Sequence, residues 1–351
     1  MKPLTEIELK FRVPAAQRAA LVAEMARGHC ESLSLAAIYL DTPDRRLARA
    51  GIAWRLRREG RRWVQTLKGA VAGSLARFEH EVERPAASRD ASLHAGTEVG
   101  DRLIAILDAA RAEGIEPEVR FRTEVRRSAR RLRSGGAVIE VALDEGRLVA
   151  GDASARILEV EFELVSGPPA ALLALAERWR RRHALTYDPC TKAERGDRLA
   201  GGAAHPAPRR AKRLRYAADA TAQQAWQAVV DECLDQITRN AAALCDGDPA
   251  LRVEHVHQLR VGIRRLRSAL RCFDGWVDAV PDALVEGLRE LFATLGRARD
   301  IDVLGSGVVA ELLRAGAPPP RLPPVDAGSD PVAALRADAA QRLLLAWVAW
   351  R

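Results

Sequence analysis

The sequence is poor in the features on which disulfide-rich, zinc-binding and membrane-spanning proteins depend. Its five cysteines are odd in number, scattered and free of CxxC pairs, which argues against a disulfide framework and a zinc site. They are predicted to be reduced core thiols. The longest uncharged apolar run, Leu343 to Trp350, is far shorter than the roughly twenty residues of a membrane span. Because the N-terminus also lacks the apolar segment of a signal peptide, the chain is predicted to be cytoplasmic, with no membrane partner.

Aromatic residues are scarce as well, at 5% of the chain, whereas charged residues make up 29% and give a formal net charge of +8. A basic chain of 351 residues suits one large or two ordinary domains and a polyanionic partner. Charge alone does not choose among nucleic acid, an anionic membrane and polyphosphate. Stacking sites for single-stranded nucleic acid need aromatic side chains beside the cations, so nucleic acid is not expected as a partner.

What the sequence does contain is a repeated alternation of charged and apolar residues. The alternation is complete from Glu6 to Val13, which predicts a strand with one apolar and one wholly charged face. A solvated outer face would explain one such strand, but the pattern recurs. The later segments are Trp54–Arg57, Phe78–Glu83, Arg120–Arg122, Ile139–Asp144 and Leu158–Leu164.

Several antiparallel strands with this pattern can close into a barrel, with the apolar faces under flanking helices and the charged faces around a shared lumen. Carboxylates crowded in such a lumen repel one another, and so do the arginines that face them. Divalent cations on the carboxylates and a chain of phosphates on Arg and Lys would satisfy both groups. The pattern therefore predicts a tunnel that binds metal ions and phosphates.

Helices and turns are predicted between these strands. Amphipathic helices over about 15–27, 101–113 and 170–183 could cover the barrel. Hairpin turns are predicted at Ser134-Gly135-Gly136 and at Asp144-Glu145-Gly146-Arg147.

Glu6-Ile7-Glu8-Leu9-Lys10 resembles the ExExK signature of the CYTH superfamily, the triphosphate tunnel metalloenzymes. Further segments follow in the order of that family over about the first two hundred residues. They are Tyr39–Thr42, Arg55–Arg57, Thr66–Lys68, Arg77 with Glu79, Arg120 with Arg122, Leu143–Gly146, Glu159–Glu163 and Lys192–Gly196. The five-residue signature alone is weak, but the ordered set is specific.

The resemblance implies a role for each matching charged residue. One or two Mg²⁺ or Mn²⁺ ions would be held by Glu6, Glu8, Asp144 and two of Glu159, Glu161 and Glu163. Strand parity puts the last three glutamates on one face and does not choose between them. The implied phosphate ligands are Lys10, Arg55, Arg57, Lys68, Arg77, Arg120, Arg122, Lys192 and Arg195. Glu6, Glu8 and Lys10 would form the catalytic set.

A second region follows a linker that is rich in small residues and proline, from Gly201 to Pro208. The predicted domains are 1–200 and 213–351, with a linker over 201–212. Apolar residues then recur at helical spacing, from about Thr221 to Leu244 and from about Pro249 or Val253 to Phe273. One face of the second helix carries a basic ridge, which consists of His257, Arg260, Arg264 and Arg267. A solvated helix face would explain this ridge if it stood alone.

Val256–Arg267, followed by Leu295–Leu304, resembles the CHAD domain, a histidine-rich helical domain that often follows CYTH and binds inorganic polyphosphate. The resemblance implies that polyphosphate binds the basic ridge. CHAD domains look like two related four-helix halves, whereas this sequence stops at Arg351 without a second His/Arg helix. A truncated helical domain is therefore expected, in which the apolar helix around Leu343, Leu344 and Trp347 has little to pack on.

The predicted fold class is α+β: a closed antiparallel β-barrel of about eight strands with flanking helices, followed by an all-α helical bundle. The predicted function, implied by the resemblance, is metal-dependent hydrolysis of inorganic triphosphate to pyrophosphate and phosphate. Two alternatives stay open. The barrel could act as a hydrolase or cyclase on an organic triphosphate such as thiamine triphosphate or ATP, which would need an aromatic or apolar patch at a tunnel mouth. It could also be a non-enzymatic polyphosphate-binding protein, although such a protein has no use for so many lumen carboxylates.

Overall fold

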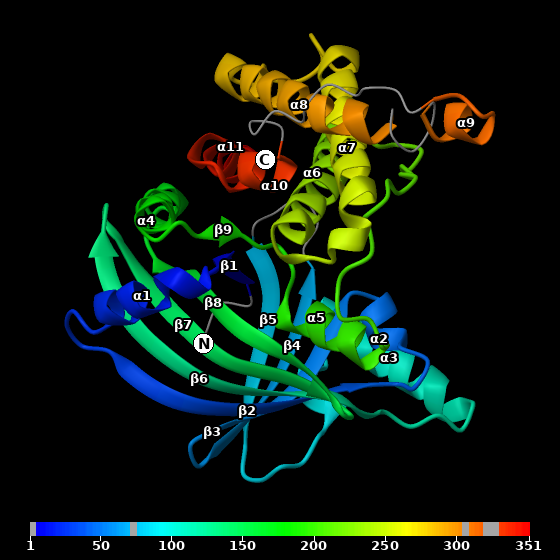
Figure 1. Ribbon diagram of the computed structural model, residues 1–351. Coiled ribbons are helices and arrows are strands. Elements are labelled where there is room, and N and C mark those ends of the chain that lie inside the picture. The colour runs from blue at the N-terminus through cyan, green and yellow to red at the C-terminus, as the bar shows by residue number, and fades with distance from the viewer. Residues whose placement is uncertain (1–4, 71–75, 304–308, 319–329) are drawn as a thin grey trace. The chain divides into compact units, whose positions relative to one another are not determined.

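The computed structural model describes residues 5–70, 76–303, 309–318 and 330–351. The chain forms two compact units, one of residues 1–185 and 190–204 and the other of residues 186–189 and 205–351. The predicted fold class is confirmed, because the first unit contains a closed antiparallel barrel of eight strands and the second is helical (Figure 1). The predicted bounds of the two domains and of the linker at 201–212 stay a prediction.

The barrel is built from antiparallel strands, several of which are long and curved (Figure 1). The strands are β1 (Thr5–Arg12), β2 (Glu31–Asp41), β3 (Ile52–Glu59), β4 (Arg62–Ala70), β5 (Ala76–Arg84), β6 (Glu118–Ser134), β7 (Ala137–Ala150) and β8 (Ala153–Ser166). Their order in the sheet is β5-β4-β3-β2-β6-β7-β8-β1, and pairing of β1 with β5 closes it. The helices of this unit are η1 (Ala15–Gln17), α1 (Arg18–Met25), α2 (Arg46–Arg49), η2 (Ala91–His94), α3 (Glu98–Ala112), α4 (Pro169–Arg182) and α5 (Lys192–Ala200).

The alternation in β1 sorts its side chains as predicted. Leu9 and Phe11 are fully buried on the outer face of the barrel. The Phe11 ring meets Phe162 of β8 edge-on at 5.7 Å, and Phe162 meets Trp179 of α4 in the same way at 5.7 Å. Burial of these large apolar side chains beneath α4 stabilises the wall. The charged residues of β1 consequently face the lumen.

The prediction of a hairpin turn at Asp144-Glu145-Gly146-Arg147 is wrong, because these residues lie within β7. Gly146 pairs there with Val125 of β6 and Ile157 of β8. A Cβ atom on Gly146 would lie 2.0 Å from the backbone oxygen of Glu124. The glycine therefore permits a close approach of two strands. The turn comes later, at Gly151, whose φ is 55°.

One end of the lumen is apolar, because α5 packs against it. The Tyr39 and Phe121 rings stack there with centroids 4.4 Å apart, and both belong to a buried cluster that includes Leu199 of α5. A Cβ atom on Gly196 would lie 2.1 Å from the Phe121 ring, so only glycine lets the helix come this close. The charged part of the lumen is thereby confined to the rest of the barrel.

A pair of histidines, of which one is buried, lies on the outer face of the barrel. His94 of η2 is fully buried, and its Nδ1 lies 3.0 Å from Nδ1 of His80 on β5. The His94 Nε2 atom lies 3.0 Å from Nε2 of Gln65, an amide nitrogen that can only donate. His94 is therefore an acceptor at Nε2 and a donor at Nδ1. Burial and, to a lesser extent, His80 lower the pKa of His94 to about 4.

The low pKa of His94 predicts that the barrel becomes less stable at acidic pH. An unfolded histidine binds a proton below about pH 6.5, whereas His94 in the fold does so only near pH 4, so stability should fall as the pH falls through this window. The difference between the two pKa values corresponds to a loss of at most about 3 kcal/mol in the free energy of unfolding. Urea unfolding at a series of pH values measures it, and His94→Gln should have a flatter pH dependence than the wild type. An equal slope in the two proteins would contradict the assignment.

The second unit is built from β9 (Thr186–Tyr187), α6 (Ala222–Asp246), η3 (Pro249–Leu251), α7 (Arg252–Cys272), α8 (Asp282–Val303), α9 (Val309–Arg314), α10 (Pro331–Arg336) and α11 (Asp338–Trp350). The expectation that α11 has little to pack on is wrong. Leu344 and Trp347 are buried in the main helical core, and Trp347 Nε1 donates a hydrogen bond to the Leu284 carbonyl oxygen of α8 at 3.2 Å. Leu343 and Trp350 are half-buried against the same core.

All five cysteines are free thiols. Three of them are buried, but Cys30 is half-buried and Cys272 is exposed, so the prediction of core thiols is wrong for these two. Among the helices in the described ranges, none combines the length and the hydropathy that crossing a membrane requires.

Candidate active site

The register of β1 brings its charged residues opposite charged partners on both neighbouring strands. The pairs are Glu6 with Arg77 of β5, Glu8 with Glu163 of β8, and Lys10 with Glu161 of β8. Glu6 and Lys10 are buried, with 7% and 6% of their surface exposed. Buried charges persist only when they are paired, and the lumen supplies the partners in two clusters.

The first cluster, called the Asp144 cluster, consists of the carboxylates of Asp144, Glu159 and Glu161. One oxygen of each lies within 4.8 Å of the others. The Lys192 ammonium lies 2.7 Å from Asp144 Oδ2, 2.5 Å from Glu159 Oε1 and 2.6 Å from Glu161 Oε1. Arg127 of β6 binds Asp144 through two hydrogen bonds of 2.7 Å and also contacts Glu161.

These cations decide the charge state of the cluster. Burial alone would raise the pKa of Asp144, but the charges of Lys192 and Arg127 outweigh it and hold the pKa below its usual range. The same two cations hold the pKa of Glu161 well below its usual range. Burial opposes the charge on Lys192, yet the three carboxylates raise its pKa well above the ordinary value. Asp144 and Glu161 are therefore ionised at neutral pH.

Helix α5 supplies two of the cations from its first turn. These are Lys192 and Arg195, and Arg195 Nη1 lies 2.7 Å from Glu159 Oε2. A further cation, Lys10 of β1, lies 3.4 Å from the same oxygen through its Nζ atom. The helix begins with a capping box, in which the Thr191 side chain accepts from the Glu194 backbone and the Glu194 carboxylate accepts from Thr191. This arrangement satisfies the free N–H groups of the first turn and fixes where the two α5 cations emerge.

The second cluster, called the Glu6 cluster, consists of the carboxyl groups of Glu6, Glu79 and Glu81 and lies around Lys68 and Arg55. The Lys68 ammonium lies 2.6 Å from Glu6 Oε1 and 3.1 Å from Glu79 Oε1. Arg55 of β3 lies 3.6 Å from Glu79 and 3.9 Å from Glu81. Arg57, next on the same face of β3, lies 3.3 Å from Glu81.

Glu6 differs from the acids of the Asp144 cluster, because it holds its proton at neutral pH. Burial is the largest cause and raises the pKa of Glu6 to about 8, although Lys68 opposes it. A hydrogen bond with Glu79 and the charges of Glu8 and Glu79 act in the same direction as burial. Attraction to Glu6 and Glu79 outweighs burial and raises the pKa of Lys68.

The carboxylates have the chemistry that a divalent cation requires, since Mg²⁺ and Mn²⁺ prefer oxygen ligands. Within the Asp144 cluster, three carboxylate oxygens already surround one small cation, the Lys192 ammonium, at 2.5–2.7 Å. An oxygen cage of this size fits a divalent ion with the remaining positions filled by phosphate or water. Of the three candidate glutamates on β8, the structure gathers Glu159 and Glu161 around Asp144, whereas Glu163 lies opposite Glu8 and Glu140.

Most of the predicted phosphate ligands lie in or beside these clusters. Those in contact with a cluster carboxylate are Lys10, Arg55, Arg57, Lys68, Lys192 and Arg195. Arg77 is half-buried opposite Glu6. Arg120 lies at a β-bulge and pairs with Glu118 at 3.2 Å. Arg122 is exposed on the face of β6 opposite Phe121, so the structure does not bring it to either cluster.

Three residues in or beside the clusters are not among the predicted site residues: Arg127, Glu79 and Glu81. The alternation in Phe78–Glu83 was a usable signal for the two glutamates. Arg127 gives no such signal, because the sequence around it, Arg126-Arg127, does not alternate. Its inward direction follows from its register opposite Asp144, which the sequence alone does not reveal.

The basic ridge of the helical unit lies on α7 and partly packs against α8. Arg260 donates to the Phe292 carbonyl oxygen at 2.8 Å, and its guanidinium lies 4.1 Å from the centre of the Phe292 ring. The Arg267 guanidinium lies 5.4 Å from the same ring. These cation–π contacts hold two of the ridge arginines in place. Arg264 is exposed, and His257 is half-buried.

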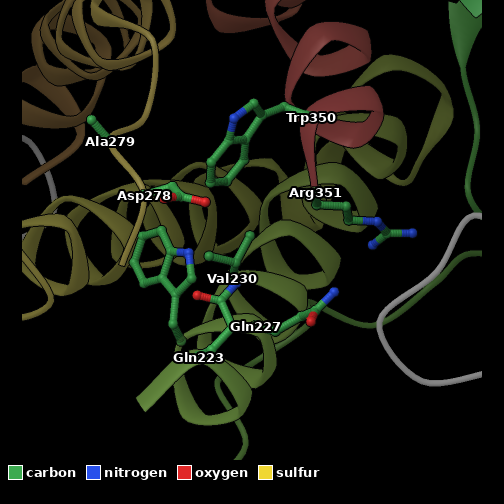
Figure 2. A pocket seen from close by; sticks show the side chains of 8 residues that line it. Gln223, Gln227, Val230, Asp278, Ala279, Trp350 and Arg351 are labelled. Carbon is green, nitrogen blue, oxygen red and sulfur yellow. The ribbon is translucent and has the colours of Figure 1, made fainter. Parts of the chain in front are cut away.

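A pocket of about 240 Å³ also lies in the helical unit (Figure 2). Its lining residues are Gln223, Trp226, Gln227, Val230, Asp278, Ala279, Trp350 and Arg351. One carboxylate and one guanidinium are among them, so the pocket differs chemically from the barrel lumen, where acids and cations are crowded. We assign no role to it.

Comparison with known proteins agrees with this geometry. Residues 4–196 match the family model of the CYTH domain, and residues 228–351 match that of the CHAD domain. The inorganic triphosphatase of Haemophilus influenzae is 28% identical over 199 residues, which cover 55% of this chain and 54% of the relative. The chain thus spans about half the length of that curated relative.

Two solved structures are also similar. One is a Hippeastrum protein described as a candidate adenylyl cyclase with a dominant triphosphatase activity, at 20% identity and a TM-score of 0.40, covering 56% of this chain and 96% of that one. The other is the CHAD domain of the plant Ricinus communis, at 34% identity and a TM-score of 0.32, covering 41% and 50%. Since the CYTH model matches more than half of the 351 residues, the chain belongs to the CYTH family.

Proposed function

We propose that this protein is a metal-dependent inorganic triphosphatase, which hydrolyses triphosphate to pyrophosphate and phosphate in the barrel lumen. The observation that carries the proposal is the pairing of acidic and basic clusters on the inner face of a closed barrel. A ligand that carries phosphates and divalent cations can replace the ion pairs on both sides at once. The curated relative from Haemophilus influenzae, named an inorganic triphosphatase, supports the same reading.

The residues divide into two roles in this proposal. The Asp144 cluster, with Glu6 and Glu8, would hold one or two Mg²⁺ or Mn²⁺ ions, which supply Lewis acidity toward the phosphate oxygens. The cations would bind phosphate oxygens, orient the chain and neutralise the charge that develops on the leaving pyrophosphate. They are Lys10, Arg55, Arg57, Lys68, Lys192 and Arg195, together with the newly found Arg127. The roles of Arg77, Arg120, Arg122 and Glu163 stay predictions.

The aromatic residues of the lumen argue against an organic triphosphate as the main substrate. A nucleotide or thiamine group would need an accessible apolar surface beside the phosphate ligands. Tyr39 and Phe121 lie on the lumen face near Arg55, but they are 6% and 4% exposed and are covered by α5. A non-enzymatic polyphosphate binder is disfavoured because its site would gain nothing from three carboxylates around one cation.

A phosphate-release assay tests the proposal. The full chain is incubated with triphosphate, pyrophosphate, ATP or thiamine triphosphate in the presence of Mg²⁺ or Mn²⁺. We expect metal-dependent release from triphosphate that exceeds release from the other three substrates by at least about tenfold. Preference for ATP or thiamine triphosphate would favour the organic substrates, and no release from any substrate would favour the binding protein.

We further propose that the basic ridge of α7 binds inorganic polyphosphate. Arg260 and Arg267 are held against Phe292, so they present their charge in a fixed place, and Arg264 between them is exposed. A linear polyanion gains affinity from such a row mainly by releasing counterions. Binding should therefore weaken steeply as the salt concentration rises.

Arg264→Ala provides the test for the ridge. Because Arg264 is exposed, its loss should lower polyphosphate affinity several-fold and reduce the salt dependence without lowering the melting temperature. The matched control is Arg289→Ala, which removes a cation from α8 whose side chain is 57% exposed and pairs with Glu286 at 2.8 Å. Titration of labelled polyphosphate at several salt concentrations measures both variants. Equal losses in the two would mean that overall charge, and not the ridge, binds polyphosphate.

A further inference from the structure

Lys192 occupies an unusual position for a side chain that would bind phosphate. Its ammonium donates a hydrogen bond to Glu161 Oε1 at 2.6 Å. It also lies at ion-pair distance from the other two members of the Asp144 cluster, 2.7 Å from Asp144 Oδ2 and 2.5 Å from Glu159 Oε1. The side chain is 12% exposed, and Asp144 and Glu159 are 1% and 0% exposed. In this arrangement the Lys192 ammonium is thus surrounded by three carboxylates.

The other cations of this wall bind the cluster differently. Arg127 binds both oxygens of Asp144 through its planar fork, which is the usual geometry of a structural Arg–carboxylate pair, and it also contacts Glu161 but not Glu159 in the contacts of the described residues. Arg195 contacts Glu159 at Oε2, whereas Lys192 contacts Oε1. Lys192 is therefore the cation that lies among the three oxygens that a divalent ion would bind.

The backbone of Lys192 is fixed, but its ammonium can move. The residue is the first of α5, directly after the Thr191 capping box, and Gly196 holds the helix against Phe121. The four-carbon stem, by contrast, has several rotatable bonds and carries a compact point charge. The ammonium can therefore leave the carboxylates without any movement of the helix.

We propose that Lys192 and a divalent cation are alternative occupants of the Asp144 cluster, and that the metal ion displaces the ammonium into the lumen, where it binds phosphate. The inference rests on the proposed function, since it presumes a metal requirement. A divalent ion bound to the three oxygens that surround the Lys192 ammonium at 2.5–2.7 Å would lie almost at the position of its nitrogen, where the two cations would overlap and repel each other strongly. Metal loading would thus both complete the cation site and free a phosphate ligand, which couples metal binding to triphosphate binding.

The exchange predicts the direction in which removal of the Lys192 ammonium changes the affinity for a metal ion. An internal competitor weakens metal binding, so removal of the Lys192 ammonium should strengthen it, although the same change removes a phosphate ligand. We expect Lys192→Met to bind Mn²⁺ about tenfold more tightly than the wild type in the absence of triphosphate, within the usual range of coupling between sites. With Mn²⁺ present, the same variant should bind a non-hydrolysable triphosphate analogue more weakly.

The experiment titrates Mn²⁺ into the metal-free full chain and counts free Mn²⁺ by its electron paramagnetic resonance signal. The matched control is Arg195→Met, which removes one positive charge from the same helix turn but leaves the three Lys192 contacts in place. A gain in Mn²⁺ affinity that is several-fold larger for Lys192→Met than for Arg195→Met supports the exchange. Equal gains, or no gain for Lys192→Met, would overturn it.

The same titration separates the inference from the proposed function. A wild-type chain that binds no Mn²⁺ at any concentration would refute the metal requirement itself, whereas a wild type that binds Mn²⁺ as tightly as Lys192→Met would refute only the exchange. If Lys192→Met fails to fold without metal, Lys192→Gln keeps two amide donors among the carboxylates and is titrated in its place. The same ordering of affinities is expected for that variant.

Discussion

Replacing Glu6 by glutamine should reduce metal-dependent triphosphate hydrolysis by at least about 100-fold while leaving the barrel as stable as before at neutral pH. Activity should fall because an amide replaces a carboxylate that would bind the metal ion. Stability should hold because the pKa of Glu6 lies near 8, so the native side chain is already mostly neutral at pH 7 and glutamine resembles it in shape and charge.

The pH dependence of stability gives an independent readout of the same change. The folded pKa of Glu6 is raised from 4.5 to about 8, so its contribution is present below about pH 4.5 and is lost as the pH rises through 8. Glu6→Gln lacks this loss and should melt at a higher temperature than the wild type at about pH 9. Equal melting temperatures at that pH would contradict the assigned environment of Glu6.

Glu83→Gln is the matched control for the activity measurement. Glu83 lies on β5 and its side chain is 64% exposed, with Arg62 at 3.4 Å. The chemical change is the same, but neither cluster loses a member, so hydrolysis should stay within about twofold of the wild type. Wild-type activity in Glu6→Gln would remove Glu6 from the proposed metal site.

The barrel could be predicted because its strands alternate, and alternation is a local property of the sequence. The apolar face of β1 lies beneath α4 and its charges face inward, as the period of two requires. Long-range register is not local. For this reason the position of Arg127 opposite Asp144 could not be foreseen, and parity did not distinguish Glu163 from its two neighbours.

Two local patterns were misleading for physical reasons. Arg120-Phe121-Arg122 alternates like the other strands, but a bulge interrupts the pairing of β6 with β2 there, and Phe121 faces the apolar end of the lumen under α5. Asp144-Glu145-Gly146-Arg147 has the composition of a turn, yet its glycine serves a close contact between strands. In both cases a tertiary contact outweighs local sequence preference.

The position of α5 against the barrel depends on one glycine, Gly196. The Gly196→Ala variant should therefore be less stable and should hydrolyse triphosphate more slowly. A Cβ atom there would lie 2.1 Å from the Phe121 ring, and overpacking of this kind typically costs about 1–3 kcal/mol. Helix propensity alone favours alanine over glycine by about 1 kcal/mol, so a fall in the free energy of unfolding would identify the clash. Because Lys192 and Arg195 emerge from the same helix, its displacement should lower kcat/KM by at least about tenfold.

Gly201→Ala separates this clash from a general effect of alanine at the end of α5. Gly201 has φ −82°, and the nearest neighbour of an added Cβ atom would be the Arg198 carbonyl oxygen at 3.3 Å, so the change requires only a small shift and should cost much less than Gly196→Ala. Thermal unfolding and triphosphate hydrolysis are measured for both variants well below their melting temperatures. The Phe121 ring lies against α5 one turn beyond Lys192, so a shift of the helix at Gly196 should also move the Lys192 side chain. A Gly196→Ala protein that loses stability but hydrolyses triphosphate at the wild-type rate would show that the lumen cations do not depend on the position of α5.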